Sequence, residues 1–541
     1  MFAASAQAAS PAHAYPWNQP GCPCAPTLHK GTPAEAGMVA SALEDIDGTI
    51  SRALVRRVAP GAVVLVARRG VIADWEAYGY ASIYTDAHFN TVAHPRPKAD
   101  NRPHPDRMQK NTIFDMASVT KLFTATAIMQ LWDAGKFKLD DPVAKYIPAF
   151  RVHGKEAVTI RQLLTHTSGF RPSPPTPLYA VKGSRKDKLA YLYNLPLEHP
   201  PGTHYVYSDI NFIVLGALIK RLSGEREDVF LRKHLTGPLH MSDTMFNPPD
   251  SLKPRIAATE YQPWVGRGML RGEVDDGNAW ALDGVAGHAG LFSSAHDLAV
   301  FGQMMLNGGT YDGVRVLSEQ AVKLLLTNWN KRFPGNATGL GWSINRDYMM
   351  GALSGPATAG HEGFTGTMIA INPKNDVIAI LLTNRVHPTR TGPSVVTMIR
   401  HVFTDIANAI PVQAPDRGAA WFAGYGEYLN RTLTARVEPH AHATLSWQTW
   451  YRMQPDEDYG SIAASPDGKR WTTLRHLTGT SDGWQTRKLK LPAHTLYVRF
   501  RYRTDDRTNG RGWYVDAIET SADGKTTAAK VTDSQWHKRD Y

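Results

Sequence analysis

The segment FDMASVTKLFTATAIMQL, residues 114–131, places a serine and a lysine three positions apart at the start of an apolar run. Residues three apart lie on one face of a helix, so the hydroxyl of Ser118 and the amine of Lys121 are expected to meet. Apolar side chains continue to Trp132, and Gly135 is a suitable helix end. The pattern therefore predicts a buried helix that presents Ser118 at its N-terminal end.

This position suits an activated nucleophile, because unpaired backbone N–H groups at a helix N-terminus favour negative charge. A serine needs a neighbouring base near pH 7, and a desolvated lysine can be that base. The alternative is an N-cap serine followed by a surface lysine. Since S-x-x-K arises by chance about once or twice in a chain of this length, the motif alone does not decide.

A second motif, HYVYSDINFIVLG, sets Tyr207, Ser208 and Asp209 just before an apolar helical run. A buried tyrosine beside a protonated lysine loses its phenolic proton more easily, so Tyr207 is a candidate base or proton relay. The alternative is a loop tyrosine that packs on the core.

A third motif, GHEGFTGTMIAIN, places His361 and Gly363 at the start of an expected strand. Glycine there allows a substrate backbone to approach, and the N–H of Phe364 could pair with that of Ser118 as an oxyanion hole. His361 could help hold the tyrosine proton or contact substrate. The alternative is a strand histidine with turn glycines.

The three motifs occur in the order S-x-x-K, Y-x-D, H-x-G, and with them the chain resembles the serine β-lactamase and penicillin-binding-protein superfamily of the class C kind. The resemblance covers about residues 35–410. The nearest likeness is to D-alanyl-D-alanine carboxypeptidase-type proteins, through IAATE, GNAWALDGVAGHAGLFS, TGLGWSIN and TNRVHP. It implies an α/β fold, in which a β-lactamase/transpeptidase-like sheet with flanking helices stands beside an all-α region and the acylated serine lies between them.

The resemblance also implies a role for each motif. Ser118 would be the nucleophile, Lys121 the general base, Tyr207 the proton relay and His361 the basic residue of the strand. The N–H groups of Ser118 and Phe364, with Gly363 beside them, would form the oxyanion hole. The family needs no metal and no cofactor. Thr165-His166-Thr167-Ser168-Gly169 belongs to a family loop interpreted as structural, and a pocket-lining role for His288 is a minor alternative to close packing.

Two departures from the family pattern bear on the substrate. Asp209 stands where asparagine is usual, and its charge would tend to keep Lys121 protonated. Glu362 stands in the strand motif where a Lys-Thr-Gly triplet would recognise a substrate carboxylate, which Glu362 would repel. Recognition of a D-alanine carboxylate must then come from Arg171 or Arg385, or does not occur. This raises the prospect of ester or neutral amide substrates.

The order of elements supports a sheet built from both ends of the domain. A helix within residues 36–58 precedes a hairpin turned at Arg69-Gly70, and a second hairpin at 365–384 precedes a closing helix at 394–410. Mostly helical segments lie between, which indicates a helical insert. Residues 82–112 read as a long polar loop, in which His88, His94 and His104 are interpreted as solvated rather than metal-bound.

Beyond Pro411 the pattern alternates with period two, which predicts a connector at 411–438 and an antiparallel β-sandwich at 439–541. This part loosely resembles MAM-like or jelly-roll modules, which suggests attachment to carbohydrate or cell wall. The tryptophans could line a sugar-binding face but are more often core: Trp447, Trp450, Trp471, Trp484 and Trp513. Four acidic residues could hold Ca²⁺, although a solvated acidic loop is the favoured interpretation: Asp456, Glu457, Asp458 and Asp516.

The net charge of +11 over 541 residues could suit an anionic partner, but no dense Lys/Arg tract favours nucleic acid, and a solvated basic surface is preferred. No apolar run approaches the roughly 20 residues of a membrane span. Residues 1–34 form an Ala-rich leader and Pro-rich lead-in, which predicts a secreted or periplasmic protein. Cys22 and Cys24 offer only a strained local disulfide and a poor zinc site.

The sequence thus predicts an exported serine hydrolase that acts through a Ser118 acyl-enzyme on a small peptide, ester or lactam. The favoured activity is that of a D-alanyl-D-alanine carboxypeptidase. The alternatives are an esterase, amidase or acyl transferase and, in another class, a penicillin-binding sensor or scaffold without turnover.

Overall fold

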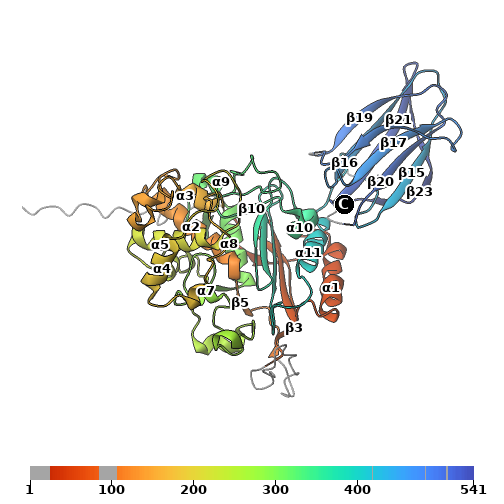
Figure 1. The fold of residues 1–541 in the computed structure, drawn as a ribbon. Coiled ribbons are helices and arrows are strands. Elements are labelled where there is room, and N and C mark those ends of the chain that lie inside the picture. The colour runs from red at the N-terminus through yellow and green to blue at the C-terminus, as the bar shows by residue number, and fades with distance from the viewer. Residues whose placement is uncertain (1–24, 85–105, 417, 482, 507–509) are drawn as a thin grey trace, which may run out of the picture. The chain divides into compact units, whose positions relative to one another are not determined.

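The computed structural model describes residues 25–84, 106–416, 418–481, 483–506 and 510–541 (Figure 1). Most of the predicted leader lies outside these residues, as do Cys22, Cys24, His88, His94 and His104. The described chain forms two compact units. Among the described residues, the first takes in 25–30, 59–344 and 359–392, and the second takes in 31–58, 345–358 and 393–541 with its gaps.

The helices and strands have the following bounds. The helices are α1 Ala40–Val55, α2 Thr120–Asp133, α3 Ile160–Leu164, α4 Arg185–Tyr193, α5 Asp209–Ser223, α6 Glu227–Leu231, α7 Gly277–Trp280, α8 Ala295–Leu306, α9 Glu319–Leu325, α10 Asp347–Met350 and α11 Val396–Asn408. The strands of the first unit are β1 His29–Lys30, β2 Gly61–Arg68, β3 Val71–Ser82, β4 Asp106–Arg107, β5 Ile113–Asp115, β6 Met245–Phe246, β7 Leu291–Ser294, β8 Thr310–Tyr311, β9 Val314–Arg315, β10 Ser343–Ile344, β11 Ala359–Gly363, β12 Thr367–Asn372 and β13 Val377–Thr383. Those of the second unit are β14 Ala420–Phe422, β15 Asn430–Arg436, β16 Ala443–Arg452, β17 Tyr459–Ser465, β18 Thr472–Leu477, β19 Gln485–Leu491, β20 Tyr497–Arg503, β21 Gly512–Ala522, β22 Lys525–Ala528, β23 Lys530–Ser534 and β24 His537–Arg539.

The main sheet has the order β1-β3-β2-β13-β12-β11-β10, so the early hairpin lies directly beside the late one. β2 and β13 pair antiparallel, with Leu65 opposite Ile380. All residues of β2, β12 and β13 are buried, which explains their nearly continuous apolar sequences. The predicted sheet assembled from distant segments is therefore confirmed.

Helix α8 packs on this sheet against β2, β12 and β13. Gly302 permits the close approach, because a Cβ at this position would lie 3.1 Å from a side-chain carbon of Ile378. Helix α2 lies in the helical region, where it packs on α5, α6 and α9, and the ring of Phe123 stacks on that of Phe301 at 4.4 Å. Residues 120–131 are all buried, so α2 is an internal helix and not an amphipathic surface one.

The C-terminal part contains two antiparallel sheets with the orders β19-β16-β21-β14-β24 and β18-β17-β20-β15-β23. Their inner faces share one core, in which the ring of Phe500 from β20 lies edge-on to Trp447 and Trp513, at 5.8 and 5.9 Å. This confirms the predicted β-sandwich. However, β14 and β15 belong to these sheets, so the strands begin at Ala420, inside the segment 411–438 that was expected to be a connector.

The tryptophans of the sandwich do not form an exposed row. Trp447 and Trp513 are buried in the core, whereas Trp450, Trp471 and Trp484 are half-buried. Asp458 is also buried and accepts backbone N–H groups of Gln454 and Asp505. Within the described ranges, no group of three or more acidic, histidine or cysteine residues is placed to hold a metal ion. The structure thus favours the core role of the tryptophans, and carbohydrate binding stays a prediction.

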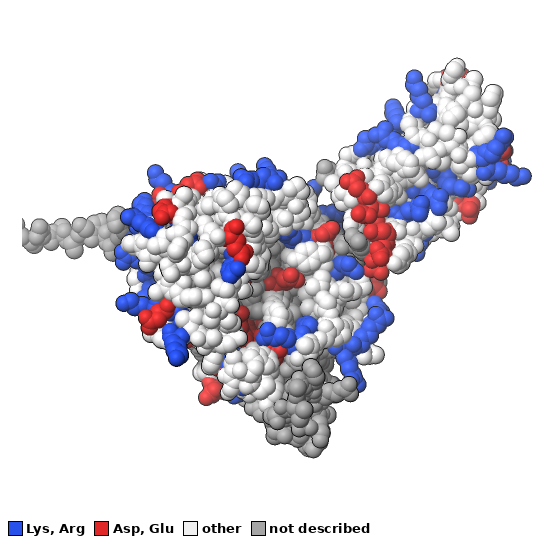
Figure 2. Space-filling model, in the orientation of Figure 1, with Lys and Arg blue, Asp and Glu red and all other residues white. Residues whose placement is uncertain are grey.

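Two further observations concern the surface. On the face shown in Figure 2, Lys and Arg side chains are scattered and do not gather in one tract. None of the helices in the described part of the chain is long and apolar enough to cross a bilayer.

Candidate active site

Ser118 lies in a short 3-10 helix, Ala117–Val119, that leads directly into α2. The amine of Lys121, one turn later, donates a hydrogen bond of 2.8 Å to the Ser118 hydroxyl. The same amine donates to Asp209 Oδ1 at 2.9 Å and to the backbone carbonyl of His288 at 3.2 Å. The Lys121 side chain is completely buried, so these three acceptors replace the water that would otherwise solvate its charge.

The backbone turn before the nucleophile is held by side chains of the sheets. Ala117 has a φ of +44°, a conformation that is uncommon for a residue other than glycine. Its N–H donates to Asp115 Oδ1 at 2.8 Å, and the Thr367 hydroxyl donates to the Met116 carbonyl at 3.1 Å. The strained turn is therefore fixed by contacts from β5 and β12, which orient Ser118.

The charge of Lys121 is set by two opposing effects. Burial by itself would lower the pKa of the amine, but the nearby Asp209 carboxylate and Tyr207 phenol outweigh it and raise the pKa above its ordinary value. The Lys121 amine also lies 4.8 Å from the centre of the Tyr207 ring. In the resting site Lys121 is therefore an ammonium, which must lose a proton before it can accept one from Ser118.

Tyr207 precedes α5, and the loop at 165–169 positions it. The N–H of Ser208 donates to His166 Nδ1 at 3.1 Å, and the His166 ring lies 4.6 Å from the Tyr207 ring. Although Tyr207 exposes 37% of its surface, desolvation of its hydroxyl raises the pKa of the phenol, against the effects of Lys121 and of hydrogen bonding with Lys121 and Ser118. The phenol therefore keeps its proton at rest, next to both Ser118 and Lys121.

Strand β11 supplies the other wall of the site. The ring of His361 lies 6.0 Å from that of Tyr207. A Cβ on Gly363 would lie 2.4 Å from the Met116 carbonyl oxygen, so only glycine lets the strand approach the nucleophile turn this closely. Phe364, which follows the strand, exposes 54% of its surface. The structure thus brings the predicted oxyanion elements, Ser118 at a helix start and Phe364 at a strand end, onto neighbouring segments.

Three residues considered in the sequence have other contacts. Arg171 is bound by Glu198 at 2.6 Å, and Arg385 donates to the carbonyl of Gly392 at 3.5 Å. The His288 imidazole is buried and contacts Asp276 at 3.0 Å, and His288 meets Lys121 through its backbone carbonyl. Although burial opposes it, the contact with His288 holds the pKa of Asp276 at about 2.

Sequence reasoning missed Arg390. Its guanidinium forms a two-pronged pair with the buried Glu260 and lies 5.2 Å from the ring of Phe364 and 5.5 Å from that of Trp264. This arginine therefore stands beside the predicted oxyanion hole within a partly exposed aromatic wall. Its motif, TNRVHPTR, carries no spacing that would signal a contact with Glu260, which lies 130 residues earlier.

A serine, a buried lysine and a tyrosine that meet at the start of a helix, with a glycine strand alongside, define a serine hydrolase. The family description Beta-lactamase matches residues 46–401, and the chain belongs to this family.

Relatives support this assignment. A Salmonella typhi protein named "Putative D-alanyl-D-alanine carboxypeptidase" is 34% identical over 400 residues, which cover 68% of this chain and 89% of the relative. The protein of the same name from Salmonella typhimurium strain LT2 matches equally well.

Two solved structures share the fold. The hydrolase EstCE1, described as having promiscuous acyltransferase activity, has a TM-score of 0.53 and 20% identity, over 68% of this chain and 99% of its own. A penicillin-binding protein homolog from Caulobacter crescentus has a TM-score of 0.52 and 20% identity, with the same coverage. At this identity the likeness concerns the fold alone.

Proposed function

We propose that this protein is an exported D-alanyl-D-alanine carboxypeptidase that cleaves peptidoglycan-type peptides through an acyl-enzyme on Ser118. The hydrogen bond of 2.8 Å between the buried Lys121 amine and the Ser118 hydroxyl carries the proposal, because it pairs a nucleophile with a group able to take its proton. The names of the relatives at 34% identity support the peptide substrate. The Ala-rich leader supports export.

The proposed cycle divides the proton movements among three side chains. Lys121 reacts as the neutral amine, formed by loss of one proton to solvent, and accepts the Ser118 proton as the hydroxyl attacks. Tyr207 relays a proton to the leaving amine, and His361 supports the phenol from β11. The N–H groups of Ser118 and Phe364 bind the oxyanion, and water later releases the acyl group.

A second candidate is an esterase, amidase or acyl transferase that uses the same acyl-enzyme. The pairing of nearby cations favours it, since Arg171 is bound by Glu198 and Arg390 by Glu260, which weakens their attraction for a substrate carboxylate. The exposed rings of Phe364 and Trp264 offer apolar contact to a neutral acyl group. A penicillin-binding sensor without turnover remains the alternative of another class.

One set of assays separates these candidates. The wild type, Ser118→Ala and the exposed control Ser242→Ala are each mixed with a D-alanyl-D-alanine peptide, p-nitrophenyl acetate and a chromogenic cephalosporin. Release of D-alanine that is lost only in Ser118→Ala supports the carboxypeptidase. Turnover of the ester alone favours the esterase, and a stoichiometric burst without turnover favours the sensor.

Intact mass after incubation with penicillin tests the nucleophile itself. Added mass is expected on the wild type and on Ser242→Ala, and none on Ser118→Ala. Full activity of Ser118→Ala would remove the proposed mechanism.

A further inference from the structure

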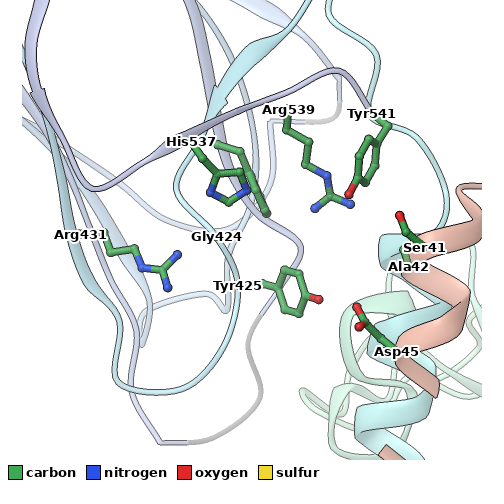
Figure 3. A pocket seen from close by; sticks show the side chains of 10 residues that line it. Ser41, Ala42, Asp45, Gly424, Tyr425, Arg431, His537, Arg539 and Tyr541 are labelled. Carbon is green, nitrogen blue, oxygen red and sulfur yellow. The ribbon is translucent and has the colours of Figure 1, made fainter. Parts of the chain in front are cut away.

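The second unit contains a cavity of about 400 Å³ that is distant in sequence from the Ser118 site (Figure 3). Its walls come from α1, from β14 and the segment after it, from β15, and from β24 and the residues after it. The side chains that matter for its chemistry are Asp45, Tyr425, Arg431, His537 and Arg539. A volume of this size lies within the usual range of small-molecule sites, roughly 300–1,000 Å³.

Arg539 is the most enclosed charge of this cavity, with only 8% of its surface exposed. One guanidinium nitrogen donates to the Asn408 carbonyl at 3.1 Å, and the group lies over the rings of Tyr541 and Phe422, at 3.8 and 4.8 Å. Its Nε is buried and lacks a hydrogen-bond partner among the described residues. A buried donor without a partner is costly, so the guanidinium is held at this wall with hydrogen-bonding capacity that no described residue uses.

Arg431, on β15, adds positive potential from the other side of His537 (Figure 3). Arg431 donates to the Ala423 carbonyl at 3.2 Å, and in the described part of the chain no carboxylate lies within ion-pair distance of Arg431 or Arg539. Burial lowers the pKa of His537, and the two arginines lower it further. Their charges therefore act together on the space that His537 borders.

Helix α1 adds to this field at its N-terminal end. Ser41, in its first turn, lines the cavity, and the N-cap residue Val39 makes no side-chain capping bond. The first turn also lacks an acidic residue. The helix dipole thus favours an anion at the end of the cavity that Ser41 lines.

Asp45 brings the opposite charge. It lies on α1 one turn beyond Ser41, and Figure 3 shows its carboxylate and the Arg539 guanidinium directed toward the same space, near the hydroxyl of Tyr425. No cation among the described residues forms an ion pair with Asp45. The cavity therefore presents unpaired charges of both signs.

We propose that this cavity binds a small zwitterion, with a carboxylate and a protonated amine, of the size of an amino acid or dipeptide. The carboxylate would bind Arg539 with Arg431 adding to the attraction from the far side of His537, the amine would bind Asp45, and the rings of Phe422 and Tyr425 would contact the remainder. The site goes beyond the proposed function and does not depend on it, although hydrolysis of a D-alanyl peptide would release an amino acid of this class.

Isothermal titration of the full chain tests the site directly, without turnover. The probes are D-alanine, L-alanine and D-alanyl-D-alanine, with propionate and ethylamine as analogues that keep one charge each. At least one zwitterion is expected to bind more than about tenfold tighter than either analogue, a difference of about 1.4 kcal/mol. Absence of zwitterion binding at 10 mM, or propionate binding as tight as that of alanine, overturns the proposal.

Variants assign the binding to this cavity. Asp45→Asn is expected to weaken zwitterion binding at least about tenfold and to leave propionate unaffected, while Arg431→Gln weakens both. Glu44→Gln, an exposed neighbour on α1, is the matched control and should change neither. Both tested side chains are outside the core, and thermal melts confirm folding. Zwitterion binding unchanged in Asp45→Asn and Arg431→Gln would place it elsewhere, for example at Ser118, and overturn the proposal.

Discussion

Replacing Asp209 with asparagine tests what holds the proton on Lys121. The two charged groups lie 2.9 Å apart, with the lysine side chain fully buried and the aspartate side chain 22% exposed. At an effective dielectric of about 20, this separation corresponds to an attraction of about 6 kcal/mol. The free energy lost in Asp209→Asn is smaller than this attraction, because solvent reaches the aspartate and asparagine keeps one acceptor oxygen for Lys121. A carboxylate at this range typically displaces a titration by about 1 to 3 pH units.

The measurement is kcat/KM for p-nitrophenyl acetate between pH 7 and pH 11.5, with the Ser118→Ala rate subtracted. Activity that requires a neutral Lys121 rises with pH, so Asp209→Asn should move this acid limb to lower pH by about 1 to 3 units. Glu225→Gln removes an equal charge from a surface ion pair with Lys233 and should leave the limb in place. If the acid limb of the kcat/KM profile is unchanged in Asp209→Asn, or moves to higher pH, the reasoning is refuted.

Three further predictions concern packing and buried charge. Gly363→Ala places a Cβ 2.4 Å from the Met116 carbonyl oxygen. This variant should slow acylation by penicillin at least about tenfold and lower the free energy of unfolding by about 1–3 kcal/mol in a denaturant titration. An unchanged acylation rate would contradict the tight fit. Burial raises the pKa of Glu227 from 4.5 to about 7, so the folded state binds the Glu227 proton more tightly than the unfolded state does. The free energy of unfolding therefore falls as pH rises from about 4.5 through 7. At about 1.4 kcal/mol per pH unit, the loss is about 3 kcal/mol. Glu227→Gln, which keeps an acceptor for Thr124, should therefore reduce the loss of melting temperature between pH 5 and pH 8, and an equal loss in both proteins would count against the buried charge. Trp447→Ala should destabilise the sandwich by about 3–5 kcal/mol in a denaturant titration, whereas a change below 1 kcal/mol would show that the shared core is not what holds the sheets.

Much of the fold could be predicted because its patterns are local. The hairpin at Arg69-Gly70 and the helix after Ser118 follow from turn residues and apolar periodicity over short windows. The start of the sandwich could not be placed in this way. β14 is only three residues long, Ala420–Phe422, and its pairing with β21 and β24 depends on segments about 90 and 115 residues later in the chain.

In the site too, some contacts follow from local sequence patterns and others depend on distant segments. Ser118 and Lys121 are one helical turn apart, so their meeting follows from helix geometry. Tyr207 and His361 were identified only through the order of three motifs. Arg390 beside Phe364 carried no signal, because its position depends on the buried Glu260, and a charge that is stable only when paired cannot be recognised from one partner.

The sequence by itself determined which groups are available for chemistry and which of them share a helix face. Only the tertiary structure decided the protonation states of these groups in the resting site. Lys121 is an ammonium because Asp209 and Tyr207, 88 and 86 residues away in the chain, outweigh the burial of its side chain. The physical reason is that the free energy of a charge depends on its surroundings in space, and spacing along the chain does not encode them.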